Sequence, residues 1–150
     1  MAEISPDELE RRFDEVIARI EEAVDFAIEG ALYELEANIK DRIFNQNEDI
    51  NNSKFGGYKS KAYKAFREKL GRQVAEKDLQ VFNNLRNSIE VDLSRRAIVF
   101  NAERYVKIAD GQEKQMNKII FESSRSEVEF AIDALNRELT KFTKSILEKE

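Results

Sequence analysis

Four acidic side chains near predicted turns and strands have the residue types that a metal-dependent nuclease uses. They are Asp78, Asp92, Asp110 and Glu113, and the last is followed directly by Lys114. Such an enzyme needs two or three carboxylates, often with a lysine, that converge on one divalent cation. The sequence lacks the Asp…Glu-x-Lys spacing along a hairpin that would bring these groups together. We therefore expect no catalytic or metal-binding residue, and the nuclease stays a minor alternative.

The composition excludes several other kinds of catalysis. The 150 residues include 0 His and 0 Cys, which excludes a Ser-His-Asp triad, a Cys-His pair and metal sites with imidazole or thiolate ligands. No glycine-rich phosphate loop is present, so we expect no cofactor. The absence of cysteine is typical of a protein in a reducing cytoplasm. We predict that the protein is not an enzyme.

Basic and aromatic residues alternate in the segment KFGGYKSKAYKAFREKLGR, residues 54–72. Cations neutralise phosphates and rings stack on bases, so one interpretation is a nucleic-acid-binding module. The other is an amphipathic helix whose aromatic rings belong to a core or to a protein interface. Under either interpretation the candidate contact residues are Lys59, Lys61, Tyr63, Lys64 and Arg67.

A second polar cluster surrounds Gly111 in the stretch KIADGQEKQMNKIIF, residues 107–121. Glycine permits a sharp turn, and we expect a loop at 110–115 that docks on another protein through hydrogen bonds and charges. An ordinary exposed turn would have the same composition. The apolar run that follows is predicted to be a third strand, or an arm that pairs with the sheet edge of a neighbour. The candidate contact residues are Asp110, Gly111, Gln112, Glu113, Lys114, Ile119 and Phe121.

Two long helices are expected to position these segments. Ser5 and Pro6 are typical of a helix start, and an apolar stripe spaced at three or four residues then predicts a helix over about 6–45. A helix of roughly 60 Å must extend beyond the core of so small a domain, and its stripe needs a partner. A second helix is predicted over about 124–148, capped by Ser123 or Ser124 together with Glu127.

Between the long helices the sequence predicts a short helix at 60–71 and a β-hairpin at about 88–101. The whole chain, residues 1–150, is then expected to form one α+β domain, with 118–121 added to the small antiparallel sheet. Apolar runs are only a few residues long, far fewer than the roughly 20 that cross a bilayer. We therefore expect no membrane partner.

Charge is distributed unevenly along the chain. The net charge is −5, but residues 1–50 carry 15 acidic and 5 basic residues, whereas residues 51–100 carry 5 acidic and 11 basic ones. Opposite charges in two parts of a chain favour head-to-tail contact between copies. Charged helix faces that are merely solvated would give the same pattern.

Residues in the middle of the chain form a pattern around the predicted hairpin. Leu85, Ser88 and Ile89 lie at its start, and Asn101, Tyr105, Ile108 and Gly111 lie at its end and after it. Upstream lie Gly57, Tyr58, Tyr63, Arg67 and Gly71. With these residues the chain resembles, over roughly residues 40–125, a family of tailed-bacteriophage neck proteins, known as tail-completion, minor tail or virion morphogenesis proteins. Asn83 and Asn84 stand where the family usually has Thr-Gly, and Val106 replaces a usual alanine.

The resemblance implies a structural role in the virion. It implies an α+β subunit that is made in the bacterial host cytoplasm and forms a symmetric ring of about six or twelve copies. The ring would lie between the portal and the tail, as a head–tail connector or tail-completion component. The implied partners are copies of the chain, other neck, portal-side or tail-tube proteins, and transiently the packaged DNA.

Overall fold

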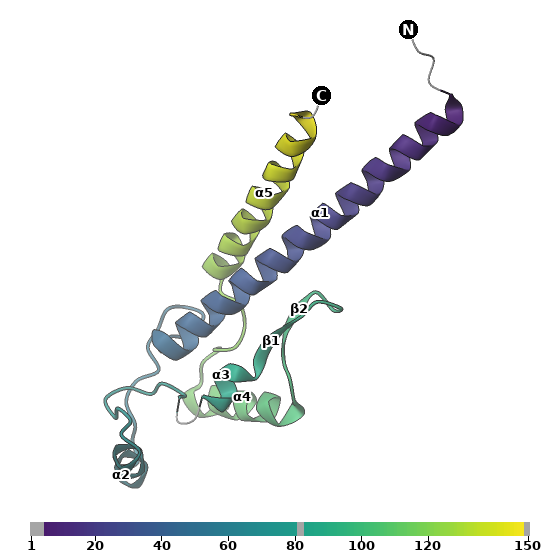
Figure 1. Ribbon diagram of the computed structural model, residues 1–150. Helices are drawn as coiled ribbons and strands as arrows, with labels where there is room; N and C mark the ends of the chain where they lie inside the picture. The colour runs from purple at the N-terminus through teal and green to yellow at the C-terminus, as the bar shows by residue number, and fades with distance from the viewer. Residues whose placement is uncertain (1–4, 81–82, 149–150) are drawn as a thin grey trace.

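The computed structural model describes residues 5–80 and 83–148, which form an α+β fold (Figure 1). Two long helices and a hairpin are present, as the sequence predicts. None of the helices within the described residues is long and apolar enough to cross a bilayer. In chain order the elements are α1 (Pro6–Lys40), the π-helical turn η1 (Asp41–Asn45), α2 (Lys61–Lys69), α3 (Asn84–Asn87), β1 (Ile89–Asp92), β2 (Ala97–Phe100), α4 (Glu103–Met116) and α5 (Arg125–Leu147).

Both long helices begin at the predicted caps. The Ser5 hydroxyl accepts a hydrogen bond from the backbone N–H of Glu8 at 3.2 Å, and Pro6 occupies the first helical position. At the start of α5 the bonds are reciprocal: the Glu127 N–H donates to the Ser124 hydroxyl at 3.3 Å, and the Ser124 N–H donates to the Glu127 carboxylate at 2.7 Å. These bonds satisfy backbone donors that have no partner inside the helix.

The helices α1 and α5 run antiparallel, side by side (Figure 1). Two ion pairs mark their register: Arg42 with Glu127 at 2.6 Å, and Glu34 with Arg137 at 3.3 Å. Moving back along α1 therefore corresponds to moving forward along α5. Extrapolated at 1.5 Å per residue, this register places the end of α5 level with about residue 23 of α1.

The first part of α1, residues 6–22, projects beyond α5 for about 25 Å (Figure 1). Every side chain from Leu9 to Glu22 is exposed to solvent. The apolar stripe continues along this projection, where none of its members is covered. Its exposed residues are Leu9, Phe13, Val16, Ile17 and Ile20.

The hairpin covers a small apolar core. β1 and β2 pair antiparallel, with Ile89 opposite Phe100 and Asp92 opposite Ala97. Arg96 adopts a positive φ of 50° in the connecting turn. The core joins the end of α1 to the hairpin and to the segment after α4. Its buried members are Ile39, Ile43, Phe44, Phe55, Leu85, Ile89 and Ile120.

Residues 118–121 do not form the predicted third strand, because other groups bind their backbone. The Ile119 carbonyl accepts a hydrogen bond from the Ile50 N–H at 3.1 Å. The N–H groups of Ile120 and Phe121 donate to one carboxylate oxygen of Glu113, at 2.7 and 3.0 Å. Because these N–H groups are already hydrogen-bonded to Glu113, the segment cannot use them to pair with a neighbouring strand.

The loop predicted at 110–115 is also wrong, since these residues lie within α4. Gly111 is helical, which costs roughly 1 kcal/mol relative to alanine. Packing outweighs this cost, because Ala109 is buried and Tyr105 and Met116 pack against the core. The chain turns instead at Asn117, whose φ of 52° ends the helix.

The buried guanidinium of Arg42 joins four segments of the chain. It is ion-paired with Glu127 at the start of α5. It also donates to the backbone carbonyls of Glu48, Ile120 and Glu122 at 3.1, 2.9 and 2.8 Å. The π-helical turn η1, the loop after it, the segment after α4 and the start of α5 therefore meet at one cation.

Replacing Glu127 by alanine should strongly destabilise the fold. Glu127→Ala would leave Arg42 buried without a counter-charge, and breaking a buried pair typically costs about 3–5 kcal/mol. Urea unfolding followed by circular dichroism measures this loss. The matched control is Glu129→Ala, which removes the exposed partner of Arg125 on the same helix and should change the unfolding free energy by at most about 0.5 kcal/mol. Equal losses in both variants would contradict the role of the Arg42–Glu127 pair.

Candidate functional site

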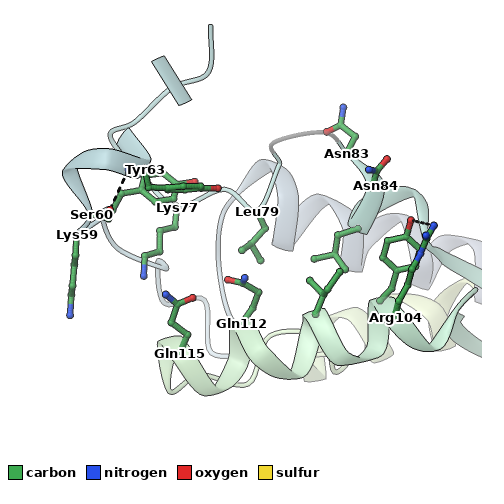
Figure 2. Close-up of a pocket in the computed structure, with 14 residues that line it drawn as sticks. Lys59, Ser60, Tyr63, Lys77, Leu79, Asn83, Asn84, Arg104, Gln112 and Gln115 are labelled. Atoms are coloured by element: carbon green, nitrogen blue, oxygen red, sulfur yellow. Dashed lines mark hydrogen bonds between the residues drawn. The ribbon is translucent and has the colours of Figure 1, made fainter. Parts of the chain in front are cut away.

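A groove of about 920 Å³ lies between α4 and the segment that carries α2 (Figure 2). One of its walls is α4, and the other is formed by side chains from residues 58–63, 77–79 and 83–85. Aromatic and aliphatic side chains make up much of its surface. These are Tyr58, Tyr63, Leu79, Leu85, Tyr105 and Ile108.

The charges in the groove all have one sign. Three cationic side chains, Lys59, Lys77 and Arg104, line it, and no carboxylate is among its described lining residues. The remaining lining groups are neutral hydrogen-bonding side chains: Ser60, Asn83, Asn84, Gln112 and Gln115. An apolar surface with a cationic rim fits an acidic amphipathic partner.

The face of α4 that lines the groove has helical spacing. Arg104, Ile108, Gln112 and Gln115 are separated by four, four and three residues, so they lie on one side of the helix. Figure 2 shows this row with Arg104 at one end and Gln115 at the other. Arg104 is held in place by Tyr105, because its guanidinium lies 4.6 Å from the ring centroid and donates to the phenol oxygen at 2.8 Å.

The opposite wall begins at the start of α2. The Ser60 hydroxyl caps α2 by accepting a hydrogen bond from the Tyr63 N–H at 3.2 Å. The ring of Tyr63 lies 5.3 Å from that of Tyr58 and 6.1 Å from that of Phe66, between centroids. Tyr63 and Phe66 are nonetheless 37% and 45% exposed, so part of each ring stays accessible to solvent.

A buried polar network holds this wall together. Arg67 is fully buried and donates to both carboxylate oxygens of Asp78, at 2.9 and 2.8 Å, and to the Gln73 carbonyl at 2.9 Å. The side-chain amide of Gln73 donates to Asp78 at 2.7 Å, and the phenol of Tyr58 donates to Asp78 at 3.1 Å. The network joins α2 to residues 73–78 and so places Lys59 and Lys77 beside the groove.

The network shifts two ionisations in opposite directions. Burial raises the pKa of Tyr58 to about 12, and the Asp78 carboxylate beside it adds to the rise. Burial also raises the pKa of Asp78, but hydrogen bonds from Gln73 and the Gln80 N–H, with the charge of Arg67, outweigh it and hold that pKa below its ordinary value. Asp78 is therefore an anion whose hydrogen bonds and ion pair are made within this wall of the groove.

The structure brings together residues from the two segments that the sequence singled out. Lys59 and Tyr63 from the basic segment and Gln112 from α4 line the same groove (Figure 2). Lys77, Arg104 and several other lining residues were missed. The signal for the residues on α4 would have been the four-residue spacing of 104, 108 and 112, which becomes visible only when 110–115 is treated as helix.

Other predicted contact residues lie elsewhere. Lys61, Lys64, Asp110, Gly111 and Lys114 do not line the groove, although Lys61, Asp110, Gly111 and Lys114 are exposed.

Three predicted contact residues have structural partners inside the chain. Arg67 is buried against Asp78, because a guanidinium can satisfy a carboxylate with two hydrogen bonds. Glu113 binds the backbone of 120–121, and Phe121 packs edge-on against Phe100 with ring centroids 5.6 Å apart. Ile119 remains exposed.

Three of the four acidic residues considered for metal chemistry have separate partners, and the fourth, Asp110, is exposed. Asp78 binds Arg67, Asp92 binds Ser94 and Arg95, and Glu113 binds backbone N–H groups. Within the described ranges no three acidic side chains form a group that could hold a metal ion.

Comparisons with known proteins give no relative: no protein-family model matches the sequence, and neither the curated proteins nor the solved structures include a match.

The raised pKa of Tyr58 leads to a prediction for alkaline pH. A phenol with a folded-state pKa of about 12, against an ordinary value of 10.0, stays protonated in the folded protein while it ionises in the unfolded chain. Its contribution to stability is complete below the ordinary pKa and is lost as pH rises towards 12. Absorbance titration of the 4 tyrosines should show one late ionisation, which Tyr58→Phe removes. The control variant Tyr33→Phe should retain the late ionisation. If Tyr33→Phe also removed it, the assignment of that ionisation to Tyr58 would be contradicted.

Proposed function

We propose that this protein is a structural subunit of a tailed-bacteriophage virion. Copies of it assemble into a ring in the neck, as a head–tail connector or tail-completion component between portal and tail. Two lines of support meet here. The resemblance over roughly residues 40–125 points to the neck of a phage particle. The exposed apolar stripe on the projecting part of α1 indicates that the chain binds a protein partner.

The exposed stripe is the observation that carries the proposal. Phe13 is 60% exposed and Ile17 is 52% exposed, although both lie on a regular amphipathic helix. The four-and-three spacing that links Leu9 to Phe13 and Val16 continues along the same face to the buried Ala27. An apolar face that continues past its partner inside the chain is the mark of an interaction surface.

The charges beside the stripe favour a protein over a membrane. Residues 6–22 carry seven acidic and three basic side chains. An anionic lipid surface attracts amphipathic helices through lysine and arginine, so it would repel this one. A basic protein surface would attract it.

The alternative function, nucleic-acid binding through residues 54–72, has less support in the structure than in the sequence. Arg67 is fully buried and Tyr58 belongs to its network, so neither is free for a phosphate or a base. A gel shift that weakens steeply with salt and is lost on Lys59, Lys61 and Lys64 substitution would favour this alternative over the ring.

Charges introduced into the stripe should abolish self-association without unfolding the chain. We expect Phe13→Glu with Ile17→Glu to turn oligomers into monomers in native mass spectrometry, while circular dichroism stays unchanged, because both side chains are already exposed. The matched control is Phe26→Glu with Tyr33→Glu. These residues are 66% and 49% exposed on the same helix, but thirteen residues is about 3.6 turns, which places Phe26 on the other side from Phe13. Equal dissociation by both pairs would contradict the proposal.

The particle itself provides the second test. Quantitative mass spectrometry of purified virions of the phage that encodes the chain should find about six or twelve copies per particle. Absence of the chain from the particle would overturn the proposed function.

A further inference from the structure

We propose that the projecting part of α1 of one copy, residues 6–22, binds in the groove between α4 and residues 58–63 of the next copy. This inference rests on the proposed function, because it names the two surfaces that meet within the ring. The occupant of the groove is a second copy of this chain.

The two surfaces of one chain cannot meet each other. The 35 residues of α1 span about 52 Å. The projecting part lies at one end of the molecule, and α2 and α4 lie near the other end (Figure 1). Contact between them must therefore join two copies, head to tail.

The shapes of the two surfaces correspond. The stripe presents Leu9, Phe13 and Val16 at intervals of four and three residues, the pattern with which an amphipathic helix enters an apolar groove. The groove has about 920 Å³ for such side chains, beside Tyr63 and Ile108. Both of these are exposed in the single chain, so they are available to a partner. Phe13 is the aromatic anchor expected near the centre of such an interface.

Charge selects this pairing over the symmetric one. Residues 6–22 have a net charge of −4, from seven acidic and three basic side chains. Two copies that paired stripe to stripe would bring these like charges together. The groove offers Lys59, Lys77 and Arg104, and no carboxylate among its described lining residues. Complementary potentials fix partner and orientation more than they add affinity.

Head-to-tail contact has a consequence for assembly. When one surface binds a different surface on the next copy, each end of the series keeps one unoccupied surface, so further copies can add. Such a contact forms a closed ring when the rotation between neighbours brings the two ends together, whereas a stripe-to-stripe dimer cannot form a ring.

Cysteine cross-linking tests the contact directly, because the chain has 0 Cys and every cross-link reports an introduced pair. A Phe13→Cys chain, labelled with a heavy isotope, is mixed with an unlabelled Ile108→Cys chain and treated with a short bismaleimide. The matched control partner is Ile132→Cys on α5, since Ile108 and Ile132 are 46% and 49% exposed. We expect about tenfold more product between labelled and unlabelled chains with Ile108→Cys than with Ile132→Cys, because a contact held in place raises the effective concentration of the two thiols.

Each other outcome overturns the inference. If product between two Phe13→Cys chains dominates, the stripes pair symmetrically. Equal yields with Ile108→Cys and Ile132→Cys, or no product above free cysteine, show that the groove is not the partner. If native mass spectrometry still finds oligomers larger than a dimer that Phe13→Glu with Ile17→Glu dissociates, the ring stands and only the docking surface is wrong.

A charge variant provides a second measurement. Lys59→Glu with Lys77→Glu should weaken self-association by about tenfold or more, since it places carboxylates against the acidic projection. Lys141→Glu with Lys144→Glu makes the same change in net charge on the exposed face of α5 and should leave self-association unchanged. An equal effect of both pairs would mean that net charge, and not the groove, governs association.

Discussion

The ion pair between Arg42 and Glu127 is the contact on which the arrangement of the whole chain depends. A buried guanidinium is tolerated only when its donors are satisfied, and here a carboxylate and three backbone carbonyls satisfy them. Because those partners come from three segments besides η1, which carries Arg42, the pair fixes the antiparallel register of α1 and α5. That register in turn determines how much of α1 has a partner inside the chain. The exposure of Phe13 and Ile17 is thus a distant consequence of where Arg42 is held.

A second buried pair, Arg67 with Asp78, performs a similar task on a smaller scale. With 37% charged residues the chain has few apolar side chains to spare, and the segment around α2 has little hydrophobic core of its own. Hydrogen bonds from Arg67, Gln73 and Tyr58 to Asp78 take its place, while the Nη1 nitrogen of Arg67 is buried with no hydrogen-bond partner among the described residues. Because Tyr58 and Asp78 belong to this network, their neighbours Lys59 and Lys77 are held beside the groove before a partner arrives, which lowers the entropic cost of binding.

Local signals predicted the helix starts and the hairpin well. Ser5 and Ser124 cap helices through bonds to residues three positions away, and alternating side chains marked both strands. The failures share a cause, since each depended on a distant partner. Gly111 indicates a turn until the packing of Ala109 and Met116 is known, and 118–121 indicates a strand until Glu113 takes its N–H groups. Arg67 was assigned to a binding surface because nothing local showed that Asp78, eleven residues later, would bury it. The groove was missed for the same reason, because its walls come from segments that only the fold brings together.

The segregation of charge along the chain acquires a physical meaning in the proposed assembly. An exposed apolar stripe is a hazard for a free subunit, because any similar stripe would bind it. Acidic side chains beside the stripe repel other copies of the same surface, whereas the basic groove attracts it. The charges thus suppress the closed, symmetric dimer and leave open the head-to-tail contact from which a ring can grow. The uneven charge in the sequence and the uncovered helix in the structure are then two aspects of one device, which makes association directional.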